Sequence, residues 1–221
     1  VNAYTRTLEP HTSYMSPSTS ENFDISMRLS LEGIGAVLSA ESEYTVIQRT
    51  IAGGPARQSG QVSSGDKIIG VAQGLDGEME DVVGWRLQDV VDKIRGPKGS
   101  VVRLLTIPKS EGSSGRTREV RLVRNEIKLE DQAAKSFVID SLDNAPSVRI
   151  GVIEVPAFYR DFRAESEGSR SFRSTTRDVR KLNEALEGDN ADGLVRGLHG
   201  NGGGSLTEAE ALTGLVTDEG P

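Results

Sequence analysis

Two glycine-rich segments constrain this chain more than any other feature of its sequence. The first is Gly33-Ile34-Gly35-Ala36, which leads into an apolar run, and the second is Asn201-Gly202-Gly203-Gly204. Glycines gather where backbone N–H groups must turn toward a partner that a side chain would block. We therefore expect two backbone sites for negative oxygen atoms. The first suits a peptide carboxylate, and the second suits the carbonyl oxygen of a reacting bond.

The composition excludes several classes of function. The chain has 221 residues and a net charge of −7 at pH 7, so no overall positive field attracts phosphates, and we expect no nucleic acid partner. With no cysteine and two histidines, disulfides and thiolate or imidazole metal sites are not expected, nor is a cofactor. No apolar run approaches the roughly 20 residues of a membrane span, so we expect at most peripheral contact with a membrane. The first residues lack the pattern of a signal peptide.

The apolar pattern divides the chain into three parts. Residues 1–30 are predicted to form a helical and linker segment, with a loop at 16–20 and a short helix capped by Ser20. Residues 31–126 contain short β-like runs separated by glycine. Residues 127–221 alternate strand and helix patterns.

The middle part predicts several strands and one helix. The strands are expected at residues 44–47, 67–71, 101–105 and 119–123. The helix is expected over residues 85–95, where apolar side chains recur at helical spacing: Leu87, Val90, Val91 and Ile94. This mixture of strands with a helix is typical of an α+β domain.

The last part predicts an α/β layer with parallel strands. A strand over residues 147–155 is followed by a charged loop at 161–171, and a second strand begins at Leu194. Ser205 and Glu208 have capping-box spacing, so Ser205 is expected to be a helix N-cap rather than a nucleophile. The helix between the two strands is predicted from apolar residues on one face: Phe172, Val179, Leu182 and Leu186.

Residues 31–126 resemble a PDZ domain of the permuted bacterial kind, a β-barrel or sandwich with a helix. The resemblance depends on four motifs, at residues 33–36, 51–56, 62–68 and 94–100. It implies that the amides of Gly33, Ile34, Gly35 and Ala36 hold the terminal carboxylate of a peptide, which adds as a strand beside the helix. Leu87 and Val91 lie one helical turn apart and would form the apolar wall of that groove; the alternative is that both are ordinary core residues.

The whole chain resembles the C-terminal processing, or tail-specific, proteases. Three further segments carry this resemblance: Glu9-Pro10-His11-Thr12-Ser13-Tyr14, residues 150–159 and residues 201–206. It implies a periplasmic serine endopeptidase that uses a Ser-Lys dyad without ATP or metal and selects exported proteins by their apolar C-termini, with an adaptor protein as a further partner left open. By motif, Gly203 or Gly204 would supply an oxyanion-hole amide, with Gly204 favoured.

The segments that carry the nucleophilic serine and the lysine base in that family are not found before Pro221. Residues 127–221 are therefore expected to be a truncated, partial catalytic core, and the chain is expected to bind peptide tails without cleaving them. The alternative is a non-catalytic PDZ-type peptide-binding module.

The strand before the second glycine segment departs from the family pattern. Arg196 stands where the family has an apolar residue, Gly197 where it has Asp and His199 where it has Arg. A buried, unpaired arginine is costly, so we expect this strand to be displaced or exposed. His199 is expected at the surface. The basic residues between Arg160 and Lys181 are interleaved with acids and predict a solvated, salt-bridged face.

Overall fold

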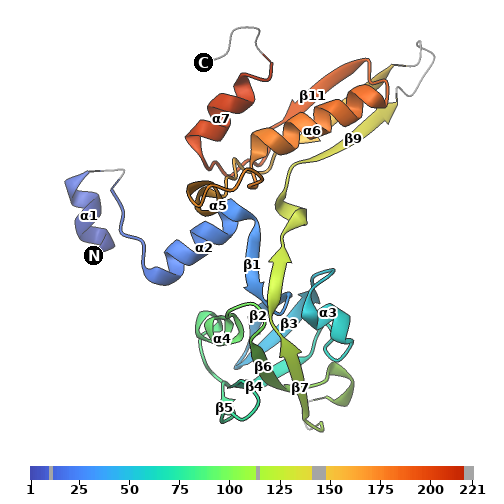
Figure 1. Cartoon of the computed structure of the whole chain (residues 1–221). Helices are drawn as coiled ribbons and strands as arrows, with labels where there is room; N and C mark the ends of the chain where they lie inside the picture. The colour runs from blue at the N-terminus through green and yellow to red at the C-terminus, as the bar shows by residue number, and fades with distance from the viewer. Residues whose placement is uncertain (10–11, 113–114, 141–147, 217–221) are drawn as a thin grey trace. The chain divides into compact units, whose positions relative to one another are not determined.

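The computed structural model describes residues 1–9, 12–112, 115–140 and 148–216. It divides the chain into two compact units, Ser30–Lys128 and a second unit that joins Val1–Leu29 with Leu129–Pro221 (Figure 1). We call them the central unit and the terminal unit. Of the predicted features, Pro10, His11 and the first residue of the 147–155 strand lie outside the described residues.

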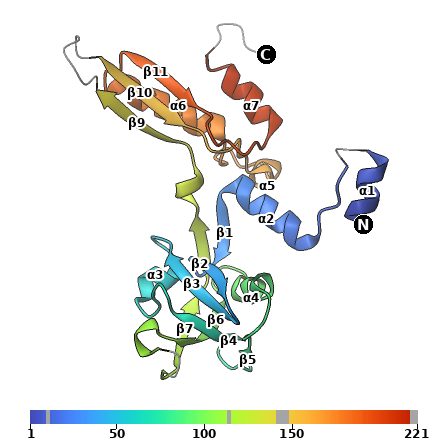
Figure 2. The same cartoon turned by 180° about the vertical axis from the view of Figure 1, so that it is seen from behind.

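Eight strands lie within the described residues of the central unit, and Figures 1 and 2 show how they are arranged. They are β1 (Ser30–Gly33), β2 (Ala36–Glu41), β3 (Tyr44–Thr50), β4 (Lys67–Gln73), β5 (Glu80–Asp81), β6 (Val101–Ile107), β7 (Arg118–Val123) and β8 (Asn125–Lys128). Its helices are α3 (Pro55–Ser59), α4 (Leu87–Ile94) and the 3₁₀ turn η1 (Lys109–Glu111). The strands predicted from the sequence and the helix predicted over 85–95 are confirmed.

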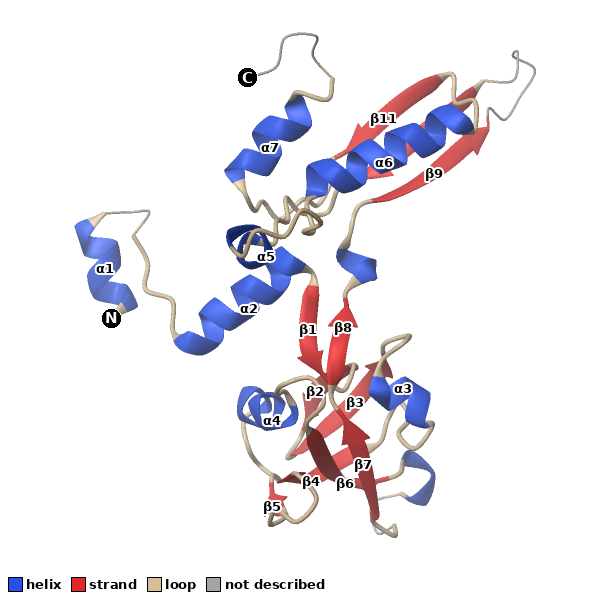
Figure 3. Ribbon diagram, viewed as in Figure 1, coloured by secondary structure: helices blue, strands red, loops and turns tan. Residues whose placement is uncertain are grey.

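The main sheet of the central unit runs in the order β2-β3-β4-β6-β7, with β5 paired to β4. Strands β1 and β8 form a separate antiparallel pair. The sheet does not close into the barrel that the sequence suggested, since β2 and β7 are edge strands in the described structure. Helices α3 and α4 lie on opposite sides of this unit (Figures 1 and 3).

Alternating side chains build the core of the central unit. Along β6, every second residue is buried, including Val102 and Leu104. Helix α4 buries Val90 and Ile94 in the same cluster, and α3 adds Ala56. The inward-facing residues of the strands and of the helices therefore pack in one apolar cluster, as expected for a half-buried sheet covered by helices.

Within its described residues, the terminal unit contains three strands and several helices. They are α1 (Asn2–Leu8), α2 (Pro17–Arg28), η2 (Glu130–Gln132), β9 (Lys135–Asp140), β10 (Arg149–Glu154), α5 (Phe162–Ser166), α6 (Thr175–Gly188), β11 (Gly193–Gly197) and α7 (Leu206–Thr213). The sheet order is β11-β10-β9, and the pairing of β10 with β11 is parallel, as predicted. Strand β9 is antiparallel to β10 and was not predicted. No described helix is long and apolar enough to span a membrane.

Helix α6 packs on the sheet of the terminal unit (Figures 1 and 2). Val179 and Leu186 from α6 join Ile153 and Val155 in one buried cluster, which Leu212 of α7 completes. Apolar residues at helical spacing thus pack against β10, the strand that precedes them in the sequence, and this packing makes the predicted α/β layer.

Two local predictions were wrong. Residues 16–20 are not a loop, because α2 begins at Pro17 with Ser16 as its N-cap, 3.4 Å from the Thr19 amide. Proline is well suited to the first position of a helix, and Ser20 is therefore inside α2. Residues 161–171 are not all loop either, since Asp161 caps the short helix α5.

Candidate functional site

The first glycine segment turns the chain from β1 into β2. Gly35 has φ +72°, and a Cβ there would lie 2.9 Å from the Cα atom of Gly54. Two backbone carbonyls of the turn face inward, because Ala56 donates to the Ile34 oxygen and Ile51 donates to the Gly35 oxygen, each at 2.8 Å. Only a residue without a side chain fits this close approach.

The amides of this turn differ in their bonding. The Leu129 amide donates to the Leu29 oxygen, and every second residue pair of β1 and β8 is hydrogen-bonded in the same way. The Gly33 amide therefore donates to its partner Asn125. Within the described residues, no hydrogen bond donated by the Ile34 or Gly35 amide is found. These two N–H groups can therefore receive an anionic oxygen atom.

Strand β2 and helix α4 lie together after this turn. The Gly35 carbonyl faces β3, and the Ala36 N–H in the same peptide group points the opposite way. The Ala36 amide therefore faces the unpaired edge of β2. On α4, Leu87 and Val91 are half-buried, whereas Val90 and Ile94 are fully in the core. The structure thus brings the predicted residues to one edge of the sheet, with free backbone groups on β2 and apolar side chains on α4.

Arg95 is a residue of this region that sequence reasoning missed. It follows α4 directly, and a Cβ on Gly33 would lie 3.9 Å from its Cγ atom. The arginine stem therefore packs against the glycine segment and adds positive charge near it. The sequence signal was its position just before the glycine that ends the predicted helix.

The second glycine segment connects β11 with α7. The Asn201 side chain accepts from the Gly203 amide at 2.7 Å and donates to the Val155 oxygen at 2.8 Å. Gly204 forms an isolated parallel bridge with Phe158. The Phe158 amide donates to the Gly203 oxygen, and the Phe158 oxygen accepts from the Ser205 amide. In such a bridge the N–H of the middle residue points away, so the Gly204 amide is directed outward, and no bond from it is found among the described residues.

Ser205 is the N-cap of α7, as predicted, because its Oγ atom accepts from the Glu208 amide at 3.4 Å. The reciprocal half of the capping box is absent from the described contacts. The Glu208 side chain turns away and is fully buried. Its partners come from segments far apart in the sequence.

The buried Glu208 carboxylate is the centre of a polar cluster that the sequence did not reveal. Arg160 donates to one oxygen at 2.6 Å, and the other accepts from the Ser174 hydroxyl at 2.9 Å and from the Thr176 amide and hydroxyl, both at 2.8 Å. Arg160 also binds Glu165, and this hydrogen bond raises the pKa of the arginine. The prediction of a solvated, salt-bridged basic face is therefore wrong for Arg160, whose side chain is largely buried and pairs with the buried Glu208.

Tyr159 connects the same segment to two others. Its fully buried hydroxyl donates to Asp178 at 2.8 Å and accepts from the Ala134 amide at 3.1 Å. Burial, together with the Asp178 carboxylate, raises the pKa of the phenol, so Tyr159 stays protonated at neutral pH. Residues 158–160 thus hold the glycine turn through Phe158 and anchor to α6 and α7 through Tyr159 and Arg160.

Arg196 lies in register in β11, opposite Ile153 of β10. The strand is therefore not displaced, but the alternative expectation of exposure is confirmed in part, since Leu194 and Val195 are 43% and 51% exposed. The side chain is half-buried, and its Nε and Nη1 atoms are buried without a hydrogen-bond partner in the described structure. Burial lowers the pKa of this guanidinium. His199 is exposed, as predicted.

Replacing Arg196 with valine is expected to stabilise the terminal unit. Unpaired buried donors cost about 1–3 kcal/mol, and valine would remove them while keeping the strand preference. Urea unfolding followed by circular dichroism measures the effect, with Arg180→Val on the exposed face of α6 as the control. A lower stability for Arg196→Val than for the control would show that the guanidinium has a favourable role.

Acidic and histidine side chains do not gather in groups that could hold a metal ion anywhere in the described ranges. The groups that the two glycine segments offer to a ligand are backbone amides, which act by hydrogen bonding. Such donors stabilise a carboxylate or a developing oxyanion without moving.

The chain is similar to known proteins along its whole length. Residues 23–107 match the family model for the PDZ domain. The chain is 43% identical over 221 residues to the tail-specific protease of Haemophilus influenzae, covering all of this chain and 29% of that protein. It is 27% identical over 212 residues to the carboxy-terminal processing protease CtpA of Bacillus subtilis, covering 96% of this chain and 38% of that protein.

A solved structure is also similar to the central part of the chain. It is the PDZ domain of the carboxy-terminal protease from Vibrio cholerae, in complex with peptide, at 52% identity. The match covers 46% of this chain and 100% of that one, with a TM-score of 0.44. The chain thus spans less than half the length of the two curated relatives named above. Along its whole length the chain is homologous to part of the tail-specific, or C-terminal processing, proteases, and its first half contains the match to a PDZ domain.

Proposed function

We propose that this chain is the recognition part of a periplasmic serine endopeptidase of the tail-specific family. The central unit binds the apolar C-termini of exported proteins along the free edge of β2, with Leu87 and Val91 contacting the peptide side chains. The amides of Ile34, Gly35 and Ala36 receive the terminal carboxylate, beside Gly33. The observation that carries this proposal is the pair of free turn amides at the start of an unpaired edge strand.

The Gly204 amide, rather than that of Gly203, would stabilise the oxyanion formed at the scissile carbonyl. The Gly203 amide already donates to Asn201, whereas that of Gly204 points outward. The attacking serine and its lysine base are proposed to belong to other parts of the protease, so that these 221 residues bind tails and do not cut them.

The test is binding of a short fluorescein-labelled peptide with an apolar, free C-terminus, measured by fluorescence polarisation. Amidating that terminus removes the charge that the amides receive and is expected to weaken binding about tenfold. Equal affinity for the two forms would contradict the carboxylate role. Mass spectrometry after prolonged incubation should find the peptide intact, and rapid hydrolysis would contradict the proposal that cleavage needs further segments.

The apolar wall is tested with Leu87→Lys and Val91→Lys. Each places a charge beside the peptide and is expected to reduce affinity about tenfold. Gln88→Lys, on the exposed side of α4, is the matched control and should bind normally. If both wall variants bind as well as the control while remaining folded by circular dichroism, Leu87 and Val91 do not contact the peptide.

A further inference from the structure

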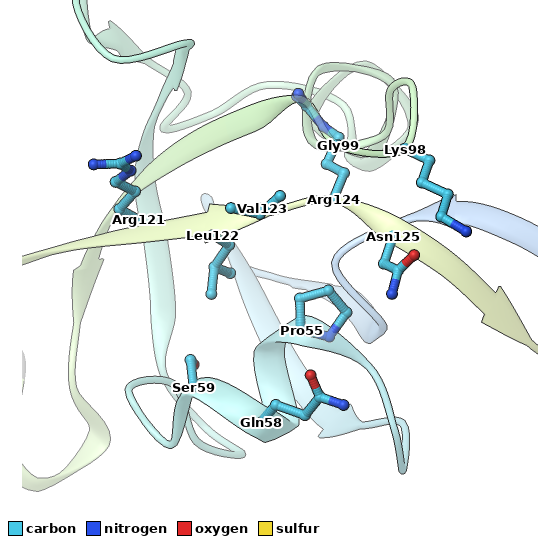
Figure 4. Close-up of a pocket in the computed structure, with 10 residues that line it drawn as sticks. All are labelled: Pro55, Gln58, Ser59, Lys98, Gly99, Arg121, Leu122, Val123, Arg124 and Asn125. Carbon is cyan, nitrogen blue, oxygen red and sulfur yellow. The ribbon is translucent and has the colours of Figure 1, made fainter.

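The central unit has a second unpaired sheet edge, at β7, on the opposite end of the sheet from β2. A pocket of about 550 Å³ lies along it, between β7 and α3 (Figure 4). The pocket is lined by Pro55, Gln58 and Ser59 of α3, by Lys98 and Gly99, and by residues 121–125. None of these residues belongs to the β2 and α4 region.

The backbone of β7 offers free hydrogen-bonding groups at this pocket. The Arg124 amide donates to Ser100, and its carbonyl accepts from Gly99, so Arg124 faces β6. Because these groups alternate along a strand, the N–H and C=O groups of Arg121 and Val123 face the unpaired edge. The next outward residue, Asn125, is already paired with Gly33 of β1. An extended segment bound to Arg121 and Val123 would therefore continue the line that β1 occupies beside β8.

The side chains at this edge are cationic and apolar. The lining contains Lys98, Arg121 and Arg124 and no acid, on a chain whose net charge is −7. Neither the Lys98 amine nor the Arg121 guanidinium has an ionic partner among the described residues. Figure 4 shows these two side chains toward opposite ends of the row, while Val123 between them is 50% exposed.

The pocket is built on a fixed frame. Arg124 is buried and donates to the Ile94 oxygen at 2.8 Å, to the Ser100 hydroxyl at 2.9 Å and to the Gln73 side chain at 2.6 Å. It thereby ties β7 to the end of α4 and to the loop that carries Lys98. The cationic groups are thus presented on a strand edge that does not need to form on binding.

We propose that the edge of β7 beside α3 is a second docking site, which takes an extended acidic peptide segment by strand addition. Free backbone groups favour a peptide over an anionic lipid surface, since a lipid offers no ladder of donors and acceptors. Acidic side chains of the segment pair with Lys98 and Arg121, and its apolar side chains cover Val123. The site shares no residue with the carboxylate-binding turn, so a second protein can be held while a substrate tail occupies β2.

The probe is a labelled peptide of alternating valine and glutamate, acetylated and amidated so that it has no terminal carboxylate. The 221-residue chain should bind it, and a valine–lysine peptide of equal length should bind about tenfold more weakly. In the double variant Lys98→Glu/Arg121→Glu this preference should reverse. The matched control, Arg180→Glu/Lys181→Glu on α6, makes the same charge change elsewhere and should keep the original preference.

Val123→Pro tests the backbone contribution. Its amide faces the unpaired edge, so proline removes one outward donor without breaking the ladder with β6. This variant should lose about tenfold in affinity for the acidic peptide and keep its circular dichroism spectrum. Hydrogen exchange on the unmodified chain should show peptide-dependent protection of the Arg121 and Val123 amides.

Several results would overturn the proposal. One is that the acidic peptide does not bind. The charges of β7 would then serve only to prevent edge-to-edge association with another sheet. Another is unchanged affinity in the double variant, or displacement of the acidic peptide by an apolar peptide with a free C-terminus. Binding of phosphatidylglycerol vesicles in preference to the peptide would assign the site to a lipid surface instead.

Discussion

Replacing Glu208 with alanine is expected to destabilise the terminal unit by about 3–5 kcal/mol, the usual cost of removing one partner of a buried ion pair. The carboxylate is fully buried and accepts hydrogen bonds from Arg160, Ser174 and Thr176. Without this carboxylate, the partly buried Arg160 guanidinium loses one of its two ionic partners. The Thr176 amide in the first turn of α6 also loses its hydrogen-bond acceptor. Glu208→Gln keeps the shape and part of the hydrogen bonding and should cost about half as much.

The two units provide an internal control for this experiment. Trp85 is the only tryptophan and belongs to the central unit, so its fluorescence follows that unit alone. Urea unfolding should show an earlier transition by circular dichroism and an unchanged transition by tryptophan fluorescence. Glu210→Gln, an exposed neighbour on α7, should change neither. If Glu208→Ala unfolds at the same urea concentration as Glu210→Gln, the buried cluster does not hold the unit together.

The sequence predicted those elements whose periodicity matches their burial. Helix α4 was found because Val90 and Ile94 repeat at helical spacing and are both buried. Strand β9 was missed because its apolar residues are consecutive: Val138 packs against the core, while Phe137 and Ile139 on the other face are 45% and 49% accessible. A strand with apolar residues on both faces shows no alternation of apolar and polar residues to detect.

The candidate sites were predictable only to the extent that they are local. Glycine spacing located both turns, but the bonding that separates Gly203 from Gly204 depends on the Asn201 side chain and on Phe158. Glu208 looked like half of a capping box, which is a sufficient local explanation for a glutamate at that position. Its actual partners, Arg160 and Ser174, are 48 and 34 residues away, and nothing in the sequence pairs them.

The second large effect is expected at Gly204, where alanine should destabilise the terminal unit by about 3 kcal/mol through backbone strain and overlap. Gly204 has φ +139°, and a Cβ there would overlap the carbonyl oxygen of Phe158. That oxygen accepts from the Ser205 amide at 2.7 Å, so it cannot move without opening the turn. The displacement would also re-aim the outward amide that we assign to the oxyanion.

The neighbouring glycines supply a graded control. Gly202 has no atom within contact distance of an added Cβ and no left-handed backbone angle, so Gly202→Ala should be nearly neutral. Gly203 has φ +89° but open space, so Gly203→Ala should cost only the strain, about 1 kcal/mol. The urea midpoint should be highest for Gly202→Ala, lower for Gly203→Ala and lowest for Gly204→Ala. The first difference measures backbone strain, and the second measures steric overlap. Equal midpoints for the three variants would mean that the turn is loose, and an oxyanion donor held in a loose turn would lose the fixed aim on which its stabilising effect depends.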